Sequence, residues 1–129
     1  MTPAEALAAH AHDECIDVTT RGRVSGRPHT VEIWFGAIGD EIYLISGNGL
    51  GADWYRNLLT LPDATIRFGD GQHWSARVRD VVDPEVRRLV GDVMGAKYTY
   101  EGDPSIGLTR QAWCYEVPVL ALALIERQV

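Results

Sequence analysis

One stretch of this chain is rich in groups that bind anions. Residues 18–31 contain no acidic side chain, although the chain as a whole has more acids than bases, and they include Arg21, Arg23, Arg27 and His29. Glycine and serine residues separate the arginines, so guanidinium groups, a hydroxyl and accessible backbone N–H groups come together. Arginine binds phosphate oxygens through two N–H groups at once, and glycine lets the backbone approach closely. The stretch is therefore a candidate anion-binding loop, with an ordinary solvated turn as the alternative.

A second candidate is the glycine-rich stretch 46–52, which lies between an expected strand and an expected helix. Gly47, Gly49 and Ala52 satisfy the spacing of the dinucleotide-binding fingerprint. However, a Rossmann unit needs a full crossover helix and a parallel strand, whereas here the expected helix has only about two turns and the next strand enters a hairpin. We expect instead a flexible loop that directs amide groups towards a helix N-terminus, where an anion can bind.

Other side chains are weaker candidates for chemistry. His10 and His12 have no third ligand nearby, so we expect no metal site. The chain has no nucleophile-elbow or P-loop motif, and no catalytic residue is assigned. Tyr98 and Tyr100 lie in a stretch without a regular pattern, residues 97–112, where they could form a wall against a flat ring.

Length and charge limit the class of protein. The chain has 129 residues, 46% of them hydrophobic, and a net charge of -6. It is long enough to bury a core without metals or disulfides, so we expect one domain over residues 1–129 and two reduced thiols at Cys15 and Cys114. The net negative charge argues against nucleic acids and anionic membranes as partners, so we expect a small molecule as the ligand. No stretch approaches the ~20 apolar residues of a membrane span, and no signal peptide is recognisable, so we expect a cytoplasmic protein.

The hydrophobic pattern predicts a mainly β, α+β fold. Expected helices cover residues 2–13, 53–61 with Asp53 as N-cap, and a segment that opens at Asp83 and carries an apolar stripe including Leu89. The Asp70–Gly71 pair predicts a tight hairpin turn. Because hairpins join most successive strands, we expect a six-stranded antiparallel sheet closed into a small barrel, with two to three flanking helices. The expected strands are 14–20, 29–36, 41–46, 65–69, 72–82 and 117–125.

Two motifs resemble a known family. Residues 19–28 read T-T-x-G-R-x-S-G-x-P and residues 54–58 read W-Y-x-N-L, with the glycine loop between them. This order resembles the deazaflavin-dependent nitroreductases, small split β-barrel proteins related to the flavin-binding pyridoxamine-phosphate-oxidase superfamily. The resemblance implies a split β-barrel, a homodimer, and hydride transfer from reduced coenzyme F420 to a quinone, a nitro compound or a similar acceptor.

The resemblance also implies roles for residues. The anion-binding stretch within residues 18–31, here called the basic loop, would hold the cofactor's phosphate tail. The glycine-rich stretch 46–52, here called the glycine loop, would line its ring or linker. Tyr98 and Tyr100 would lie on the substrate side. The implied cofactor-binding residues are Arg23, Ser25, Gly26, Arg27, His29, Ser46, Gly47, Asn48, Gly49 and Trp54.

The chain also departs from the family's pattern. Family members often carry a basic residue at the positions of Val24 and His29 and in the glycine loop. Fewer charge-assisted contacts would favour a shorter anionic tail. An FMN-dependent oxidoreductase or flavin reductase, and a barrel that binds a small ligand without catalysis, therefore stay open as alternatives.

Overall fold

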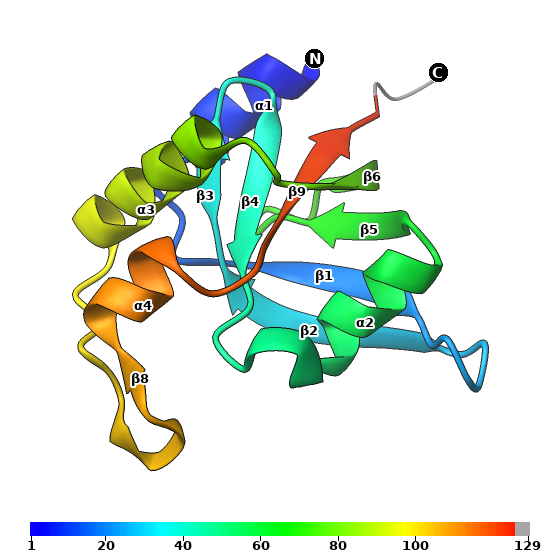
Figure 1. The fold of residues 1–129 in the computed structure, drawn as a ribbon. Coiled ribbons are helices and arrows are strands. Elements are labelled where there is room, and N and C mark those ends of the chain that lie inside the picture. Colours follow the sequence, from blue (N-terminus) through cyan, green and yellow to red (C-terminus); the bar gives the residue numbers. More distant parts are fainter. Residues whose placement is uncertain (126–129) are drawn as a thin grey trace.

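The computed structural model describes residues 1–125, so residues 126–129 of the expected single domain lie outside the described part (Figure 1). The chain forms a mainly β structure with several helices. The strands are β1 (Cys15–Arg21), β2 (Pro28–Trp34), β3 (Gly36–Ile38), β4 (Glu41–Ile45), β5 (Asp63–Arg67), β6 (His73–Asp80), β7 (Gly102–Asp103), β8 (Leu108–Thr109) and β9 (Val119–Leu124). The α-helices are α1 (Pro3–His10), α2 (Asp53–Thr60), α3 (Pro84–Lys97) and α4 (Arg110–Tyr115), and the 3-10 turns are η1 (Gly49–Gly51) and η2 (Pro104–Ile106).

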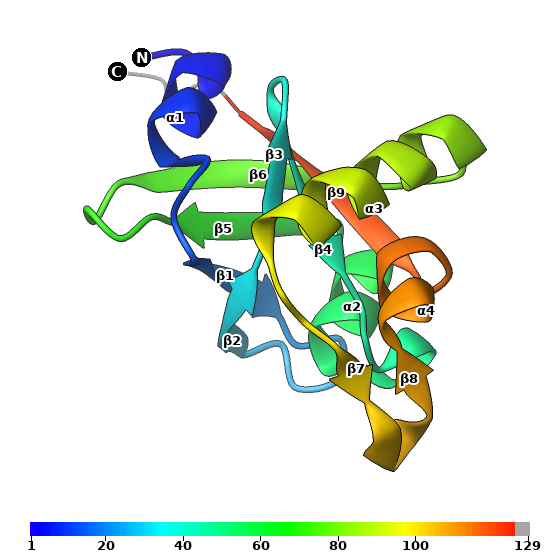
Figure 2. The same ribbon diagram turned by 90° about the vertical axis from the view of Figure 1, so that its left-hand side faces the viewer.

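Seven strands form one antiparallel sheet in the order β2-β1-β5-β6-β9-β4-β3. The two edge strands, β2 and β3, are consecutive in the chain and only Phe35 separates them. One bent segment therefore supplies both edges, which requires the sheet to curl into the half-barrel seen in Figures 1 and 2. The prediction of six strands was wrong, because the expected strand 29–36 ends as β2 at Trp34 and residues 36–38, mostly beyond its expected end, form the separate strand β3 after the buried Phe35.

The sheet separates two hydrophobic clusters. The larger one fills the concave side and includes Val18, Ile66, Trp74 and Leu122. The smaller one lies beneath α3 and α4, where Tyr43 and Ala121 face the helices. Since β9 supplies residues to both clusters, it is buried on both faces, which accounts for its continuous apolar sequence.

Local sequence signals account for most helix ends. Thr2 and Glu5 form a capping box at the start of α1, and Asp83 caps α3 by accepting a hydrogen bond from the backbone of Glu85. At α2 the prediction was wrong by one residue: Ala52 is the N-cap and Asp53 begins the helix. The stripe of α3 buries Val90 and Met94, but Leu89 remains 45% exposed at its edge.

The segment 97–112 is more ordered than its sequence predicts. It contains the short β7–β8 pair and leads into α4, which packs against α3 (Figure 2). Arg110 fixes this segment, because its guanidinium donates hydrogen bonds to the carbonyls of Gly95, Tyr98 and Tyr100 at 2.7–3.2 Å. Within residues 1–125, no helix is both long and apolar enough to cross a membrane.

Candidate phosphate site

The basic loop is a closed turn between β1 and β2. Gly22 N–H donates to the carbonyl of Arg27 at 2.8 Å, and Gly26 N–H donates to the carbonyl of Gly22 at 2.9 Å. Arg21 Nη1 donates to the carbonyl of Gly26 at 3.0 Å. Gly26 has a φ of 73°, a conformation that favours glycine. The backbone of this loop is therefore defined by its own hydrogen bonds.

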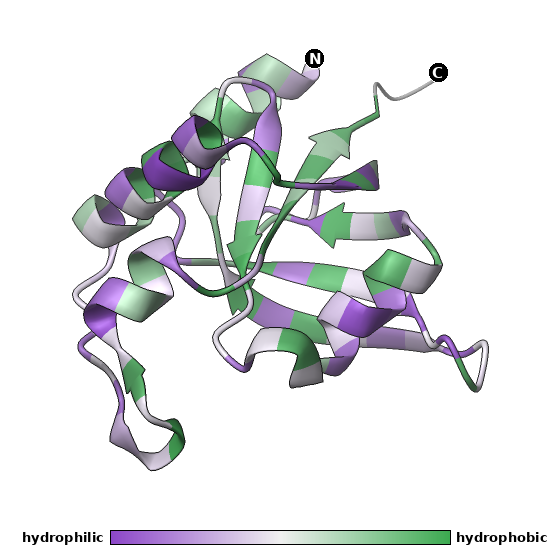
Figure 3. Ribbon diagram, in the orientation of Figure 1, coloured by the Kyte–Doolittle hydropathy of each residue, from purple (hydrophilic) through white to green (hydrophobic). Residues whose placement is uncertain are grey.

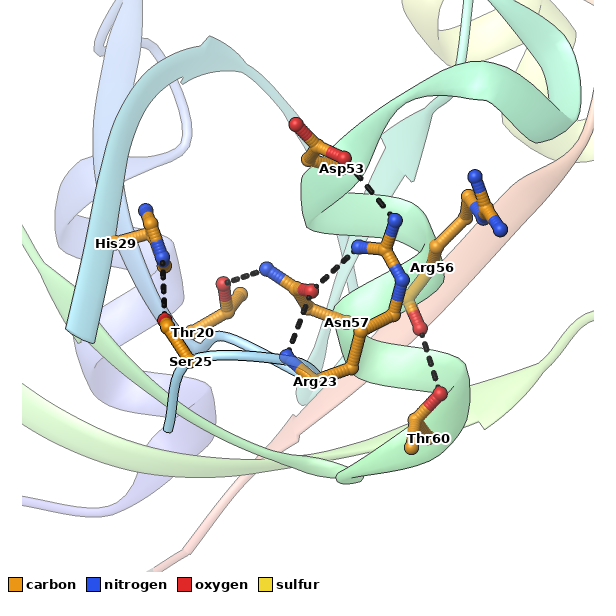
Figure 4. Close-up of polar contacts among 8 residues, drawn as sticks. All are labelled: Thr20, Arg23, Ser25, His29, Asp53, Arg56, Asn57 and Thr60. Atoms are coloured by element: carbon orange, nitrogen blue, oxygen red, sulfur yellow. Dashed lines mark hydrogen bonds and ion pairs between the residues drawn. The ribbon is translucent and has the colours of Figure 1, made fainter. Parts of the chain in front are cut away.

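A buried amide on α2 holds the loop from the other side. Asn57 Oδ1 accepts hydrogen bonds from Arg23 Nη1 at 2.7 Å and from Arg23 N at 3.2 Å, and Asn57 Nδ2 donates to Thr20 Oγ1 at 3.2 Å (Figure 4). Asn57 is only 3% exposed. The W-Y-x-N-L motif therefore has a physical role, because its asparagine fixes both the backbone and the guanidinium of Arg23. The sequence placed Asn57 in a motif but did not reveal this contact.

Arg23 also meets a carboxylate. Its Nη2 lies 3.2 Å from Asp53 Oδ1, and the side chain of Asp53 is 85% exposed whereas that of Arg23 is 21% exposed. An ion pair with one partner in water contributes little and opens readily. The Asn57 contact therefore positions Arg23, and the Asp53 contact is one that an incoming anion can replace.

Ser25 and His29 face the same space. Ser25 Oγ lies 3.5 Å from His29 Nε2 and accepts a hydrogen bond from Arg27 N at 3.2 Å. Gly22 leaves the room between these side chains, since a Cβ at this position would lie 2.7 Å from Ser25 Oγ and 2.8 Å from His29 Nε2. The loop thus brings a hydroxyl and an imidazole to one point, and a side chain at position 22 would crowd both.

These groups border a cavity of about 360 Å³ between the β1–β2 loop and the N-terminus of α2. No side chain caps that end of α2, so its first backbone N–H groups can take an external partner. Among the expected cofactor-binding residues, Arg23, Ser25, His29 and Trp54 line the cavity, together with Thr20, Gly22, Val24, Thr30, Val31, Asp53 and Asn57.

The other expected residues lie elsewhere. Gly26 and Arg27 belong to the loop but do not line the cavity. The loop at residues 46–49 turns in on itself, because Ser46 Oγ donates to the carbonyl of Gly49 at 2.6 Å. Gly47 packs against Leu108 and Trp113 in the smaller hydrophobic cluster. Asn48 and Gly49 are likewise absent from the cavity lining. The structure therefore does not join the two candidate loops into one site.

Tyr98 lies in the core. Its ring stacks on Trp34 at 4.3 Å between centroids, with 5° between the planes. Its hydroxyl donates to the carbonyl of Glu14 at 2.6 Å and accepts from Phe35 N at 3.2 Å. Burial raises the pKa of Tyr98 to about 12. Tyr100 is half-buried against Trp34 and Trp113. Neither tyrosine lines the cavity, and their substrate-side role stays a prediction.

A family model described as "Uncharacterized protein conserved in bacteria (DUF2255)" matches residues 6–113. The chain belongs to this family. No curated protein matches it. The DUF2255 match spans both the basic loop and α2, so all the residues that line the cavity lie within the matched range.

Solved structures share the fold of this DUF2255 chain. The conserved hypothetical protein Rv2991 from Mycobacterium tuberculosis is 21% identical, with a TM-score of 0.69 over 99% of this chain and 82% of that one. An F420-H2 dependent reductase is 16% identical, with a TM-score of 0.64 over 85% and 94% of the two chains. An FAD-binding protein from Mesorhizobium loti is 13% identical, with a TM-score of 0.62 over 98% and 90%. Further matches are described as a heme storage protein, HutZ from Vibrio cholerae, and as a domain-swapped dimer. At these identities the likeness establishes a shared fold.

Proposed function

We propose that this protein is an oxidoreductase that binds a flavin-type cofactor, in the first place coenzyme F420, by a phosphate group in the cavity beside Arg23. The observation that carries the proposal is the placement of Arg23: Asn57 holds its guanidinium at 2.7 Å beside the Ser25 hydroxyl and the His29 imidazole. This is a set of charged and neutral donors of the kind that binds phosphate oxygens. Solved proteins of the same fold include an F420-H2 dependent reductase and an FAD-binding protein.

The cavity fits one phosphate with part of a ring or linker. Its volume of about 360 Å³ lies at the lower end of the range for small-molecule sites, roughly 300–1,000 Å³. Gly22 lets Ser25 and His29 lie side by side at the edge of the cavity, because a Cβ at this position would crowd both. Trp54, Thr30 and Val31 provide a wall for the less polar part of the ligand. When bound, the reduced cofactor would supply the hydride, and an organic acceptor such as a quinone or a nitro compound would receive it.

The carboxylate of Asp53 favours a second candidate, FMN. It lies 3.2 Å from Arg23 and at the start of α2, so it opposes the accumulation of several negative charges there. FMN has a single terminal phosphate. Displacement of the Asp53 carboxylate from Arg23 is enough to free the guanidinium for it. An FMN-dependent oxidoreductase or flavin reductase is therefore the alternative function at the same cavity.

Titration of the purified protein with each cofactor tests the proposal. We expect saturable quenching of F420 fluorescence, with FMN as the competing ligand. R23A should weaken binding by about 10- to 100-fold, because it removes a charge-assisted contact of about 1.5–3 kcal/mol. R56A is the matched control: it removes an arginine from the exposed side of the same helix, outside the cavity lining (Figure 4).

Each outcome of the titration has a distinct meaning. Binding of FMN but not F420 would select the second candidate. Tight binding that R23A leaves unchanged would place the cofactor elsewhere. If neither cofactor binds, the proposed function is contradicted and the third alternative is left, a barrel that binds another small ligand without catalysis; the same fold includes a heme storage protein.

Two expectations accompany the proposed function. The thiols of Cys15 and Cys114 are both free, which favours action in the reducing cytoplasm. Since one protein of this fold is described as a domain-swapped dimer, we also expect a homodimer.

A further inference from the structure

The side-chain amide of Asn57 has a single possible orientation. One edge of the amide lies 3.2 Å from the backbone N of Arg23 and 2.7 Å from Arg23 Nη1. Both of these groups donate hydrogen bonds and cannot accept them. The amide oxygen must therefore face Arg23, and the amide nitrogen, Nδ2, must face Thr20.

This orientation also fixes the role of the Thr20 hydroxyl. Asn57 Nδ2 is a donor, so Thr20 Oγ1, at 3.2 Å, accepts the hydrogen bond between them. The hydrogen of the hydroxyl is then left to donate elsewhere. Within residues 1–125, neither this hydrogen nor the second N–H of Asn57 Nδ2 has an acceptor. We call the Thr20 O–H and this second N–H the donor pair.

The donor pair belongs to two buried side chains that border the cavity. Thr20 is 2% exposed and Asn57 is 3% exposed. A buried donor that lacks an acceptor costs free energy, so a ligand that supplies one is favoured. Both residues line the cavity of about 360 Å³. In the view of Figure 4, they lie between the Ser25–His29 pair and the guanidinium of Arg23.

The donor pair is suited to an anionic oxygen. Asn57 Oδ1 already accepts two hydrogen bonds, so its amide offers a ligand only an N–H. The two donor atoms, Asn57 Nδ2 and Thr20 Oγ1, are 3.2 Å apart, close enough for both to contact one small group. Arg23 adds a positive charge beside them. Hydrogen bonds to a charged oxygen are the stronger kind, and a phosphate has such oxygens on every side.

The charges around the cavity favour the same position. Of the residues that line the cavity, only Asp53 is acidic. Its side chain is 85% exposed, whereas the donor pair is buried. A phosphate bound at the donor pair therefore lies at the buried end of the cavity, and the carboxylate of Asp53 remains in water, where its repulsion is screened.

We propose that the donor pair binds an oxygen of the ligand's phosphate directly and that Thr20 thereby determines specificity for a phosphate-bearing ligand. The inference rests on the proposed function, because the phosphate is the one assigned to the cavity beside Arg23. Asn57 connects the two contacts: its oxygen fixes the guanidinium of Arg23, and its nitrogen fixes the hydroxyl of Thr20. One buried amide thus holds both groups in place before the ligand arrives, which lowers the entropic cost of binding.

Fluorescence titrations of threonine variants test the donor pair. T20V has nearly the shape of threonine but no hydroxyl, so we expect it to weaken binding of the phosphate-bearing cofactor, F420 or FMN, by at least about tenfold. T20S keeps the hydroxyl and should bind within about twofold of the unmodified protein. T65V is the matched control, because Thr65 is exposed on β5 and does not line the cavity. Equal affinities of T20V and T20S would overturn the proposal.

The same substitution in an R23A background separates direct contact from an effect through Asn57. T20V also removes the acceptor of Asn57 Nδ2, a change that can reach Arg23. If Thr20 contacts the phosphate, T20V should weaken cofactor binding by at least about fivefold in R23A as well. If T20V has no further effect in R23A, Thr20 only positions Arg23, and the direct contact is overturned.

A second variant covers the case in which T20V does not fold, as judged by circular dichroism. N57D keeps an oxygen towards Arg23 but replaces the amide nitrogen by a second oxygen, so the N–H of the donor pair is lost. We expect N57D to weaken cofactor binding by at least about tenfold. Unchanged affinity in N57D would overturn the proposal.

Inorganic phosphate tests the donor pair without a flavin. Phosphate should raise the melting temperature of the unmodified protein and of T20S above the value in sodium chloride of the same ionic strength, and should raise that of T20V less. If this occurs although neither F420 nor FMN binds, the proposed function fails and the donor pair stands. If a cofactor binds and R23A weakens it but T20V does not, the proposed function stands and the donor pair fails. If no cofactor binds and phosphate gives no such rise, both fail.

Discussion

Asn57 Oδ1 accepts two hydrogen bonds from Arg23, one from the backbone N at 3.2 Å and one from Nη1 at 2.7 Å. The two residues are 34 positions apart. A single buried amide thus fixes the position of the loop and the direction of its guanidinium. This contact connects the motif at residues 19–28 with the motif at residues 54–58. The conformation of the basic loop therefore depends on the position of α2.

Removal of this amide should lower the stability of the protein. N57A leaves the backbone N–H of Arg23 and the hydroxyl of Thr20 without their partner, so we expect the free energy of unfolding to fall by about 1–3 kcal/mol in urea denaturation. T60A is the control on the same helix, where an exposed hydroxyl donates to the carbonyl of Arg56 (Figure 4). It should change stability by no more than ~0.5 kcal/mol. Equal effects of N57A and T60A would contradict the role of Asn57.

Gly22 gives a test of the cavity itself. In G22A the new methyl group would crowd Ser25 Oγ and His29 Nε2, so these groups must move apart. We expect affinity for the phosphate-bearing cofactor to fall by at least about tenfold if the cavity is the site. G51A is the control, because nothing lies within 4 Å of a Cβ at that position. Unchanged affinity in G22A, measured by the same fluorescence titration, would exclude Ser25 and His29 as ligands of the phosphate.

Two glycines of α3 should respond differently to alanine. A Cβ on Gly91 would collide with the carbonyl of Cys114 and the ring of Tyr115, because α3 and α4 approach closely there. A Cβ on Gly95 would meet its neighbours no closer than 3.4 Å. Alanine favours a helix over glycine by about 1 kcal/mol. In thermal unfolding we therefore expect G95A to match or exceed the melting temperature of the unmodified protein and G91A to fall below it. The reverse order would disprove the close approach.

Tyr98 predicts a pH dependence of stability. Its pKa is about 12 in the folded protein against 10.0 ordinarily, so between pH 10 and 12 the folded chain keeps a proton that the unfolded chain loses. The stabilising contribution of the hydroxyl is therefore complete below pH 10 and is lost as the pH rises towards 12. Denaturant titrations should show Y98F less stable than the unmodified protein at neutral pH, with the difference narrowing above pH 10. If the stability difference between Y98F and the unmodified protein stayed constant from neutral pH to pH 12, the raised pKa of Tyr98 would be contradicted.

The hydropathy pattern in Figure 3 also has a structural meaning. Hydrophilic and hydrophobic colours alternate along the sheet strands, as expected of strands with one face on the core and one exposed. In β1, Ile16 and Val18 point into the core while Asp17 and Thr19 point outward. The alternation was readable in the sequence. Which acid lies opposite which arginine was not, because that depends on the pairing of β1 with β5, some 50 residues later in the chain.

Short-range rules made several features predictable. The capping box of Thr2 and Glu5, the turn at Asp70–Gly71 and the buried strand β9 follow from residues within a few positions of one another. The sequence also located the basic loop, because the absence of acids over residues 18–31 is a property of the sequence alone. What these features share is that their energies depend on neighbours along the chain.

Tertiary packing decided the rest. The chain bends at the buried Phe35, and residues 36–38 pair with β4 as the seventh strand of the sheet, mostly beyond the expected strand 29–36. Tyr98 stacks on Trp34 and donates a hydrogen bond to the carbonyl of Glu14, 84 positions away. These contacts hold it in the core, and it does not line the cavity beside Arg23. The glycine loop folded against Trp113, away from the basic loop. The sequence by itself determined which groups could bind a phosphate. Only the tertiary structure decided which of them meet, because contacts between distant segments depend on how the sheet curls and not on spacing along the chain.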